Sequence, residues 1–160
     1  MKKFREFPAV REWFNQSTGG LRARKKFLVI TGPSGVGKSE FVRSLFPLGA
    51  VLELNCAGVK DVCLAAFDAQ KHQCIFWDEL AVLVVANNRK IFQHPACWVD
   101  LGHSPTGSHV TYHWLNDAVS IVASNRWYDD LQSLKSYSDR CWVEANSVVL
   151  VVDVPMWISQ

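Results

Sequence analysis

The stretch "FLVITGPSGVGKSEFVRSLF", residues 27 to 46, consists of an apolar run, a glycine-rich turn and a second apolar segment with a different period. The first run has the length of a buried strand, whereas Phe41, Leu45 and Phe46 recur at helical spacing. Between them, residues 32 to 39 match the pattern G-x-x-x-x-G-K-S/T in full, in the strand–loop–helix context that this pattern requires. The stretch therefore predicts a loop that holds the phosphates of a nucleotide.

The residues of this loop are expected to act through different groups. The glycines let the backbone fold so that its N–H groups point at the β-phosphate. Lys38 would reach the β- and γ-phosphate oxygens, and the Ser39 hydroxyl would ligate Mg²⁺. The predicted cofactors are therefore ATP and Mg²⁺. The predicted binding residues are Gly32, Pro33, Ser34, Gly35, Val36, Gly37, Lys38 and Ser39.

Two adjacent acids follow the apolar residues of "CIFWDEL", residues 74 to 80. A buried strand of this kind delivers its last residues to the carboxyl edge of the sheet, where α/β folds bind ligands. Asp78 would hold Mg²⁺, mainly through water, and Glu79 would polarise the water that attacks the γ-phosphate. The alternative is that both acids only favour the start of a helix. Two adjacent acids are more typical of a site that activates water than of a kinase site, which transfers the phosphoryl group to an acceptor molecule.

A third strand, "SIVASN", ends in a polar side chain, Asn125. An amide at this point can sense the γ-phosphate and orient the attacking water. The alternative is a turn residue, because asparagine tolerates turn conformations.

The remaining pattern predicts an α/β fold, a P-loop NTPase three-layer sandwich with a central, mostly parallel five-stranded sheet and an inserted β-hairpin. For residues 80 to 92 periodicity allows helix or strand, and length favours helix. We expect a basic N-terminal helix and linker over residues 1 to 24 and the ATPase domain over residues 25 to 160. Strands are predicted at residues 26–31, 50–55, 73–79, 117–125 and 146–154, helices at 8–20, 38–46, 60–70 and 80–92, and the hairpin at 97–102 and 109–114.

The order of these motifs resembles the superfamily 3 helicase domain of the Rep proteins of small circular single-stranded DNA viruses, such as geminiviruses and circoviruses. Residues 28 to 46 look like its Walker A motif and "CIFWDE" like its Walker B motif. The hairpin stands for motif B′, "SIVASN" looks like motif C, and "SVVLVVDVPMW" is similar to the strand that closes the domain. The resemblance covers residues 25 to 157.

The resemblance implies an AAA+-like ATPase that acts in rolling-circle replication as a ring, commonly a hexamer, moving 3′ to 5′ on single-stranded DNA. ATP would lie between subunits, with an arginine finger donated by the neighbour. Arg140 matches the finger position best and Arg126 second best; the alternative for either is a surface or ion-pair role. The chain has no His-x-His site, so we expect a helicase domain without the endonuclease domain of that family.

The predicted hairpin departs from the family, because no Lys or Arg lies between Lys90 and Arg126. His103 and His109 flank its loop and are the candidate DNA-binding residues, with aromatic stacking as partial support. Neutral histidines supply little of the charge that dominates nucleic-acid affinity. The alternative is that the aromatics pack on the core and the histidines are solvated.

The histidines also mimic a zinc finger, in the spacing of His94, Cys97, His109 and His113. We expect no zinc site, because "HVTYHW" alternates like a strand, which would hold His109 and His113 roughly 13 Å apart.

The amino-acid composition limits the classes of protein to which this chain can belong. With 49% hydrophobic and 20% charged residues among 160, the chain is an ordinary globular domain with no apolar run long enough to span a bilayer and no secretory signal. Five scattered cysteines favour an intracellular location. The basic segment "RARKK", residues 22 to 26, is compatible with import into a host nucleus, with phosphate contact, or with a merely solvated lead-in.

Three functions follow in order of preference. The first is an ATP-driven, ring-forming DNA helicase whose partners are single-stranded DNA and further copies of the chain, without a membrane. The second is a nucleotide-dependent assembly module that binds ATP without unwinding DNA, which the hairpin without Lys or Arg favours. The third is a small P-loop phosphotransferase, against which stands the lack of an Arg-rich lid.

Overall fold

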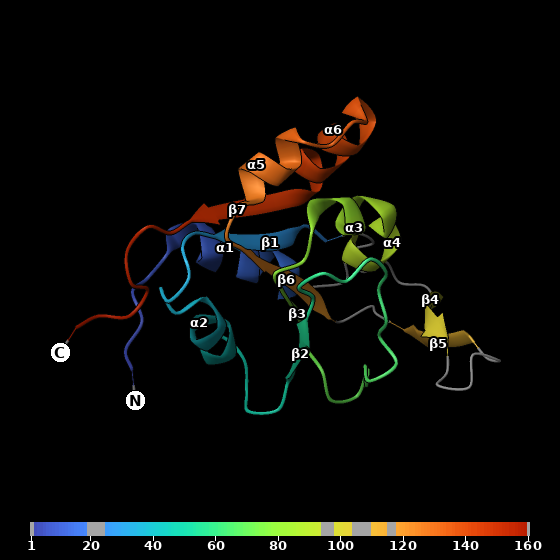
Figure 1. The fold of residues 1–160 in the computed structure, drawn as a ribbon. Coiled ribbons are helices and arrows are strands. Elements are labelled where there is room, and N and C mark those ends of the chain that lie inside the picture. The colour runs from blue at the N-terminus through green and yellow to red at the C-terminus, as the bar shows by residue number, and fades with distance from the viewer. Residues whose placement is uncertain (1, 19–24, 94–97, 104–109, 115–117, 160) are drawn as a thin grey trace.

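The computed structural model describes residues 2–18, 25–93, 98–103, 110–114 and 118–159. Its main element is a five-stranded sheet in the order β2-β3-β6-β1-β7, with every neighbouring pair parallel. Helices cover both faces of this sheet (Figure 1). The predicted three-layer α/β sandwich of a P-loop NTPase is therefore confirmed. The strands are β1 (Phe27–Thr31), β2 (Val51–Asn55), β3 (Cys74–Asp78), β6 (Val119–Ser124) and β7 (Ser147–Val151).

Strand β1 shows how the sequence produces the layers. All five of its residues are buried, and alternate side chains of a strand point to opposite faces of the sheet. Phe27 and Val29 enter one core, with residues of α3 to α6, and Leu28 and Ile30 enter the other, with residues of α1 and α2. The helices are α1 (Pro8–Thr18), α2 (Lys38–Ser44), α3 (Val82–Asn87), α4 (Arg89–Gln93), α5 (Trp127–Gln132) and α6 (Tyr137–Asn146).

Helix α1 packs against the same core as the P-loop strand. Val10 and Trp13 are 3% and 2% exposed, and the Trp13 indole N–H donates to the Lys26 carbonyl at 2.7 Å. These two residues belong to the buried face of the helix. The division of the chain at residue 24 stays a prediction.

The predicted hairpin is present as β4 (Trp98–His103) and β5 (Val110–Trp114), which pair antiparallel in a separate two-stranded sheet. It follows α4 and precedes β6 in the chain, and it projects from one side of the main sheet (Figure 1). His103 pairs with Val110 in register at the loop end of β4.

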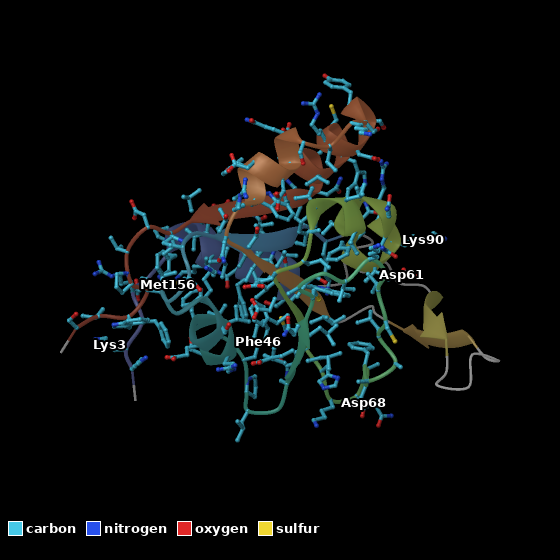
Figure 2. The ribbon with its side chains drawn as sticks, in the orientation of Figure 1. Lys3, Phe46, Asp61, Asp68, Lys90 and Met156 are labelled. Carbon is cyan, nitrogen blue, oxygen red and sulfur yellow. The ribbon has the colours of Figure 1, made fainter. Side chains whose placement is uncertain are left out.

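The helix predicted over residues 60 to 70 is wrong, because this segment forms successive turns. Its buried side chains, Val62, Leu64 and Phe67, are spaced by two and then three residues, without the regular repeat of an amphipathic helix. Asp68 then competes for the backbone that a helix would use: its carboxylate accepts from Gln70 N, and its own N–H donates to His72 Nδ1, both at 2.9 Å. Figure 2 labels Asp61 and Asp68 along this connection.

Helix forms within the segment 80 to 92, as length indicated, but it begins at Val82 and consists of two short helices, α3 and α4. They are interrupted at Asn88, whose side chain donates to the Val84 carbonyl at 2.8 Å. Helices α5 and α6 were not predicted. The signal for α6 is present in the sequence, because Ser136 precedes Asp139 by three residues and its hydroxyl accepts from Asp139 N at 3.2 Å. Among the described residues, every helix is too short or too polar to cross a membrane.

Candidate functional site: the carboxyl edge of the sheet

The carboxyl ends of three central strands bring the predicted site residues together. Strand β6 lies between β1 and β3, with Thr31 opposite Ser124 and Asp78 opposite Ala123. The residue that follows the end of each of these three strands therefore lies at the same edge of the sheet. A cavity of about 480 Å³ opens there, and its lining residues are Lys2, Ser34, Gly35, Gly37, Lys38, Ser39, Glu40, Arg43, Asp78, Glu79, Asn125 and Trp157.

The glycine-rich loop is held from two sides. Gly32 N donates to the Ser124 carbonyl of β6 at 3.1 Å, and Met156 N donates to the Val36 carbonyl at 2.9 Å. Gly35 and Gly37 have φ values of 82° and 91°, a region that only glycine adopts readily. The loop is thus held on both sides, and binding of an anion by its backbone N–H groups stays a prediction.

We expect Gly32→Ala to destabilise the protein more than the replacement of a glycine that has space for a Cβ. A Cβ at Gly32 would overlap the Val152 carbonyl oxygen, which is a backbone atom and cannot swing away. We expect a cost of about 3 kcal/mol, and therefore a Tm lower by about 9 °C. The matched control is Gly58→Ala, at φ 72° with no atom within 4 Å of the new Cβ. In Gly58→Ala the positive φ alone should cost about 1 kcal/mol. If thermal melts show the same decrease in Tm for both variants, the overlap at Gly32 is refuted.

Lys38 is folded back onto its own loop and onto β6. Its Nζ donates to the Gly32 and Pro33 carbonyls, each at 2.8 Å, and to Asn125 Oδ1 at 3.0 Å. Partial burial lowers the pKa of Lys38, and the carboxylates of Asp78 and Glu79 oppose that shift. All three donors of the ammonium group are thus used, and each of these bonds can be exchanged for a phosphate oxygen.

The two acids are held differently. Partial burial, followed by the charge of Glu79, raises the pKa of Asp78, while Lys38 acts in the opposite direction. Glu79 has φ 59° and is the one non-glycine residue with positive φ in the part of the chain described. Its N–H donates to the Ala123 carbonyl at 2.8 Å, so the turn after β3 is fixed against β6. Strained backbone of this kind is concentrated at functional sites.

Asp78→Asn is expected to raise Tm slightly at neutral pH. Because the pKa of Asp78 is raised by folding, the carboxylate destabilises the fold above that pKa, and this penalty disappears as pH falls through it. The amide carries no charge at any pH, so its Tm should exceed that of the natural chain at pH 7, and by less at pH 4. Melting curves over this range measure the difference. Asp153→Asn, at an exposed carboxylate outside the cavity, is the matched control.

The lining residues fit Mg²⁺. The Ser39 hydroxyl and the Asp78 carboxylate line one cavity, and Mg²⁺ is commonly held by one or two carboxylates with waters and substrate phosphates. No group of three or more His, Cys, Asp or Glu side chains lies together among the described residues. The donor set therefore matches a cation bound together with a nucleotide, and it is too small for a cage built by protein alone.

The remaining predicted residues lie away from this cavity or outside the description. Arg140 is on α6, with its guanidinium 5.8 Å from the Tyr137 ring, and Arg126 pairs with Asp129 at 3.7 Å before α5. Neither residue lines the cavity. His103 is placed only by its backbone at the end of β4, and His109 lies outside the described residues. Of the zinc-finger set, only His113, on β5, is within them.

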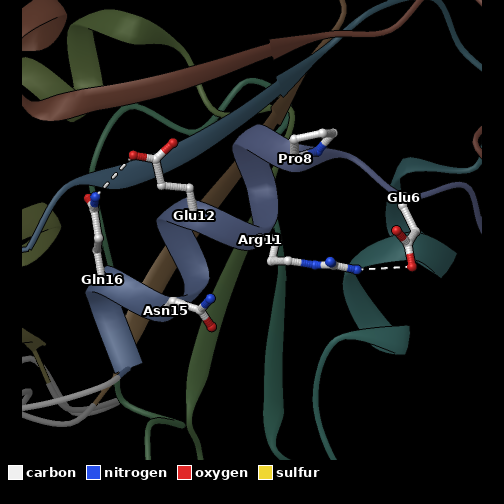
Figure 3. Close-up of a pocket in the computed structure, with 6 residues that line it drawn as sticks. All are labelled: Glu6, Pro8, Arg11, Glu12, Asn15 and Gln16. Atoms are coloured by element: carbon white, nitrogen blue, oxygen red, sulfur yellow. Dashed lines mark hydrogen bonds and ion pairs between the residues drawn. The ribbon is translucent and has the colours of Figure 1, made fainter.

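A second hollow, of about 370 Å³, lies along α1 (Figure 3). Its charged side chains are already paired: Arg11 with Glu6 at 2.9 Å, and Glu12 with Gln16 at 3.2 Å. All four side chains are exposed, three of them on α1, so this hollow contains no comparable chemistry.

Four residues that line the main cavity were not predicted as site residues: Glu40 and Arg43 on α2, and Lys2 and Trp157. Lys2 and Trp157 come from opposite ends of the described chain, and nothing in their local sequence marks them. Only the fold brings them to the loop.

Comparison with known proteins gives distant likenesses of fold. No protein-family model matches the chain, and no curated protein matches it. Among solved structures, NtrX from Brucella abortus in complex with ATP is 13% identical with a TM-score of 0.45, covering 93% of this chain and 36% of that one. The A-form apo structure of the NrS-1 C-terminal region is 12% identical with a TM-score of 0.40, covering 91% and 44%. The chain thus spans less than half the length of these structures.

Proposed function

We propose that this chain binds ATP with Mg²⁺ and hydrolyses it to ADP and phosphate. The observation that carries the proposal is the contact of Lys38 Nζ with Asn125 Oδ1 at 3.0 Å, in a cavity that also exposes Asp78 and Glu79. A phosphate-binding cation, a polar amide and a tandem acid thus meet at one sheet edge. This combination supports attack of water on a terminal phosphate.

The chemistry is distributed over these side chains. Lys38 would exchange the Gly32, Pro33 and Asn125 oxygens for β- and γ-phosphate oxygens. Mg²⁺, held by Ser39 and Asp78, would supply charge neutralisation on the same phosphates. The Glu79 carboxylate would take a proton from the attacking water as its oxygen bonds to the γ-phosphorus and the bond to the β–γ bridging oxygen breaks.

Asn125 would respond directly to the nucleotide. Without a nucleotide, its carbonyl oxygen accepts from Lys38. Once Lys38 turns to phosphate, that oxygen is released and can accept from the attacking water, while the amide N–H₂ can donate to the γ-phosphate. The same movement of Lys38 thus links binding to the orientation of water.

ATP hydrolysis in this chain would drive a Rep-type DNA helicase in rolling-circle replication. The order of motifs supports this: loop, acidic strand, hairpin, then the Asn125 strand. The hairpin projects from the body (Figure 1), as a DNA-contacting arm would. Arg140 lies outside its own cavity, so a finger role requires a second copy of the chain, in a ring. This role would place the protein inside cells, in a host nucleus.

The second candidate is an assembly module that binds ATP without unwinding DNA. The absence of Lys and Arg between residues 90 and 126 favours it, because cationic side chains supply most of the affinity for a phosphate backbone.

The deciding experiment measures ATP hydrolysis with and without single-stranded DNA, beside mass photometry of the same samples. A helicase should form ATP-dependent rings whose hydrolysis rises with DNA, and Arg140→Ala should lower hydrolysis without lowering ATP affinity. ATP-dependent oligomers that ignore DNA would support the assembly module. No hydrolysis under any of these conditions, in protein that melts cooperatively, would contradict the ATPase proposal.

A further inference from the structure

The two ends of the chain run side by side. Arg5 N donates to the Met156 carbonyl at 2.8 Å, and Ile158 N donates to the Lys3 carbonyl at 2.7 Å. Phe4 and Trp157 form an antiparallel bridge between them. Figure 2 labels Lys3 and Met156 on the same side of the molecule. We call residues 2–7 and 152–158 the terminal ribbon.

The terminal ribbon forms a wall of the main cavity. Met156 is fully buried and its N–H binds the Val36 carbonyl of the loop at 2.9 Å. The next side chain, Trp157, lies on Gly37: its Cζ3 is 2.6 Å from where a Cβ of residue 37 would be. Trp157 is only partly buried and lines the cavity. The remaining indole surface therefore faces space that a ligand would enter.

Lys2 is fixed beside this ring. Its Nζ lies 4.4 Å from the Trp157 ring centroid and 3.0 Å from Glu40 Oε2 on α2. A cation over an indole face is held by the charge distribution of the ring. Among the described residues that line the cavity, Trp157 supplies the only aromatic surface, and Lys2 stands next to it.

The positions of the charged groups set the direction of a bound nucleotide. Its γ-phosphate belongs beside Lys38, Asn125 and Glu79, where water would be activated. The rest of the molecule must then extend along the loop, past Gly37, where Trp157 forms the wall. An indole next to a phosphate loop suits a nucleobase, because every base has a face that stacks on an aromatic ring.

We propose that Trp157 and Lys2 form the nucleoside end of the site: the indole stacks on the base, and the Lys2 ammonium neutralises the phosphate nearest the ribose. This inference rests on the proposed nucleotide binding and names its substrate class as a nucleoside triphosphate, in preference to inorganic triphosphate or another phosphorylated compound. The terminal ribbon would then contact the nucleotide directly, in addition to supporting the glycine-rich loop.

The test compares the affinities of ATP and of inorganic triphosphate, each with Mg²⁺, by calorimetry. In Trp157→Leu we expect ATP affinity to fall about 10-fold, while the affinity for inorganic triphosphate changes less than about twofold, because that ligand has no base. Trp157→Phe keeps an aromatic face and should recover most of the loss. Tyr128→Leu, at an exposed aromatic on α5 outside the cavity, is the control and should change neither affinity.

The outcomes separate this inference from the function on which it rests. Unchanged ATP affinity in Trp157→Leu would overturn it. Equal losses for ATP and inorganic triphosphate would overturn it too, because Trp157 would then only support the loop. If the natural chain binds neither ligand, the proposed function itself fails. If the natural chain binds both and only ATP is weakened in Trp157→Leu, the nucleoside end is established.

Discussion

Lys38→Ala should weaken Mg·ATP binding by about 100-fold, because it removes two charge-assisted hydrogen bonds to phosphate, each contributing about 1.5 kcal/mol. Hydrolysis should fall below detection, since the γ-phosphate would lose both its counter-charge and its position beside Glu79. Calorimetry with ATP and an assay of phosphate release measure the two effects. Lys60→Ala, at an exposed lysine outside the cavity, should leave both quantities unchanged.

The same replacement should hardly affect the fold. Without a nucleotide, Lys38 donates to the Gly32 and Pro33 carbonyls and to Asn125, and Lys38 itself lines an open cavity. Water can replace the ammonium group at each of these acceptors, so we expect a change in Tm of less than about 3 °C. If Lys38→Ala melts much lower, its loss of binding would reflect unfolding. If it binds ATP with natural affinity, the loop is not a phosphate site.

The sheet could be predicted because its signal is local. Each central strand is a short apolar run such as Phe27–Thr31, buried on both faces and followed by a polar or glycine residue, so burial and site position appear in the same few letters. Because the carboxyl ends of parallel strands share one edge, the residues that follow them could be expected to lie together. The order of the strands was not predicted, and the Lys38–Asn125 contact depends on that order, in which β6 lies beside β1.

The errors and omissions have non-local causes. In residues 60 to 70 an apparent helix is replaced by turns, because Asp68 and His72 bind nearby backbone and side-chain groups and Leu64 is drawn fully into the core. Tertiary burial thus outweighs local propensity. Trp157 has no local signal either: its role is visible only when Met156 is paired with both Arg5 and Val36.

Glu79→Gln should lower the rate of hydrolysis by about 10³-fold, because the amide cannot accept the proton of the attacking water. ATP affinity should be kept within about twofold, since the side chain has the same size and Lys38, Ser39 and Asp78 remain. Single-turnover phosphate release and calorimetry measure the two quantities separately. Glu12→Gln, on the exposed face of α1, is the control and should hydrolyse ATP at the natural rate. A Glu79→Gln protein with more than a tenth of the natural rate would exclude Glu79 as the base.

The positive φ of Glu79 provides a second test of its role. A non-glycine residue at φ 59° costs about 1 kcal/mol relative to glycine, so Glu79→Gly should stabilise the fold, raising Tm by about 3 °C. Yet it should be as inactive as Glu79→Gln. A glycine that improves stability while abolishing hydrolysis would mean that the carboxylate is held there for chemistry, at the expense of the fold. If instead Glu79→Gly destabilises the protein, the contact of Glu79 N with the Ala123 carbonyl depends on a restricted backbone, and the left-handed turn serves the fold itself.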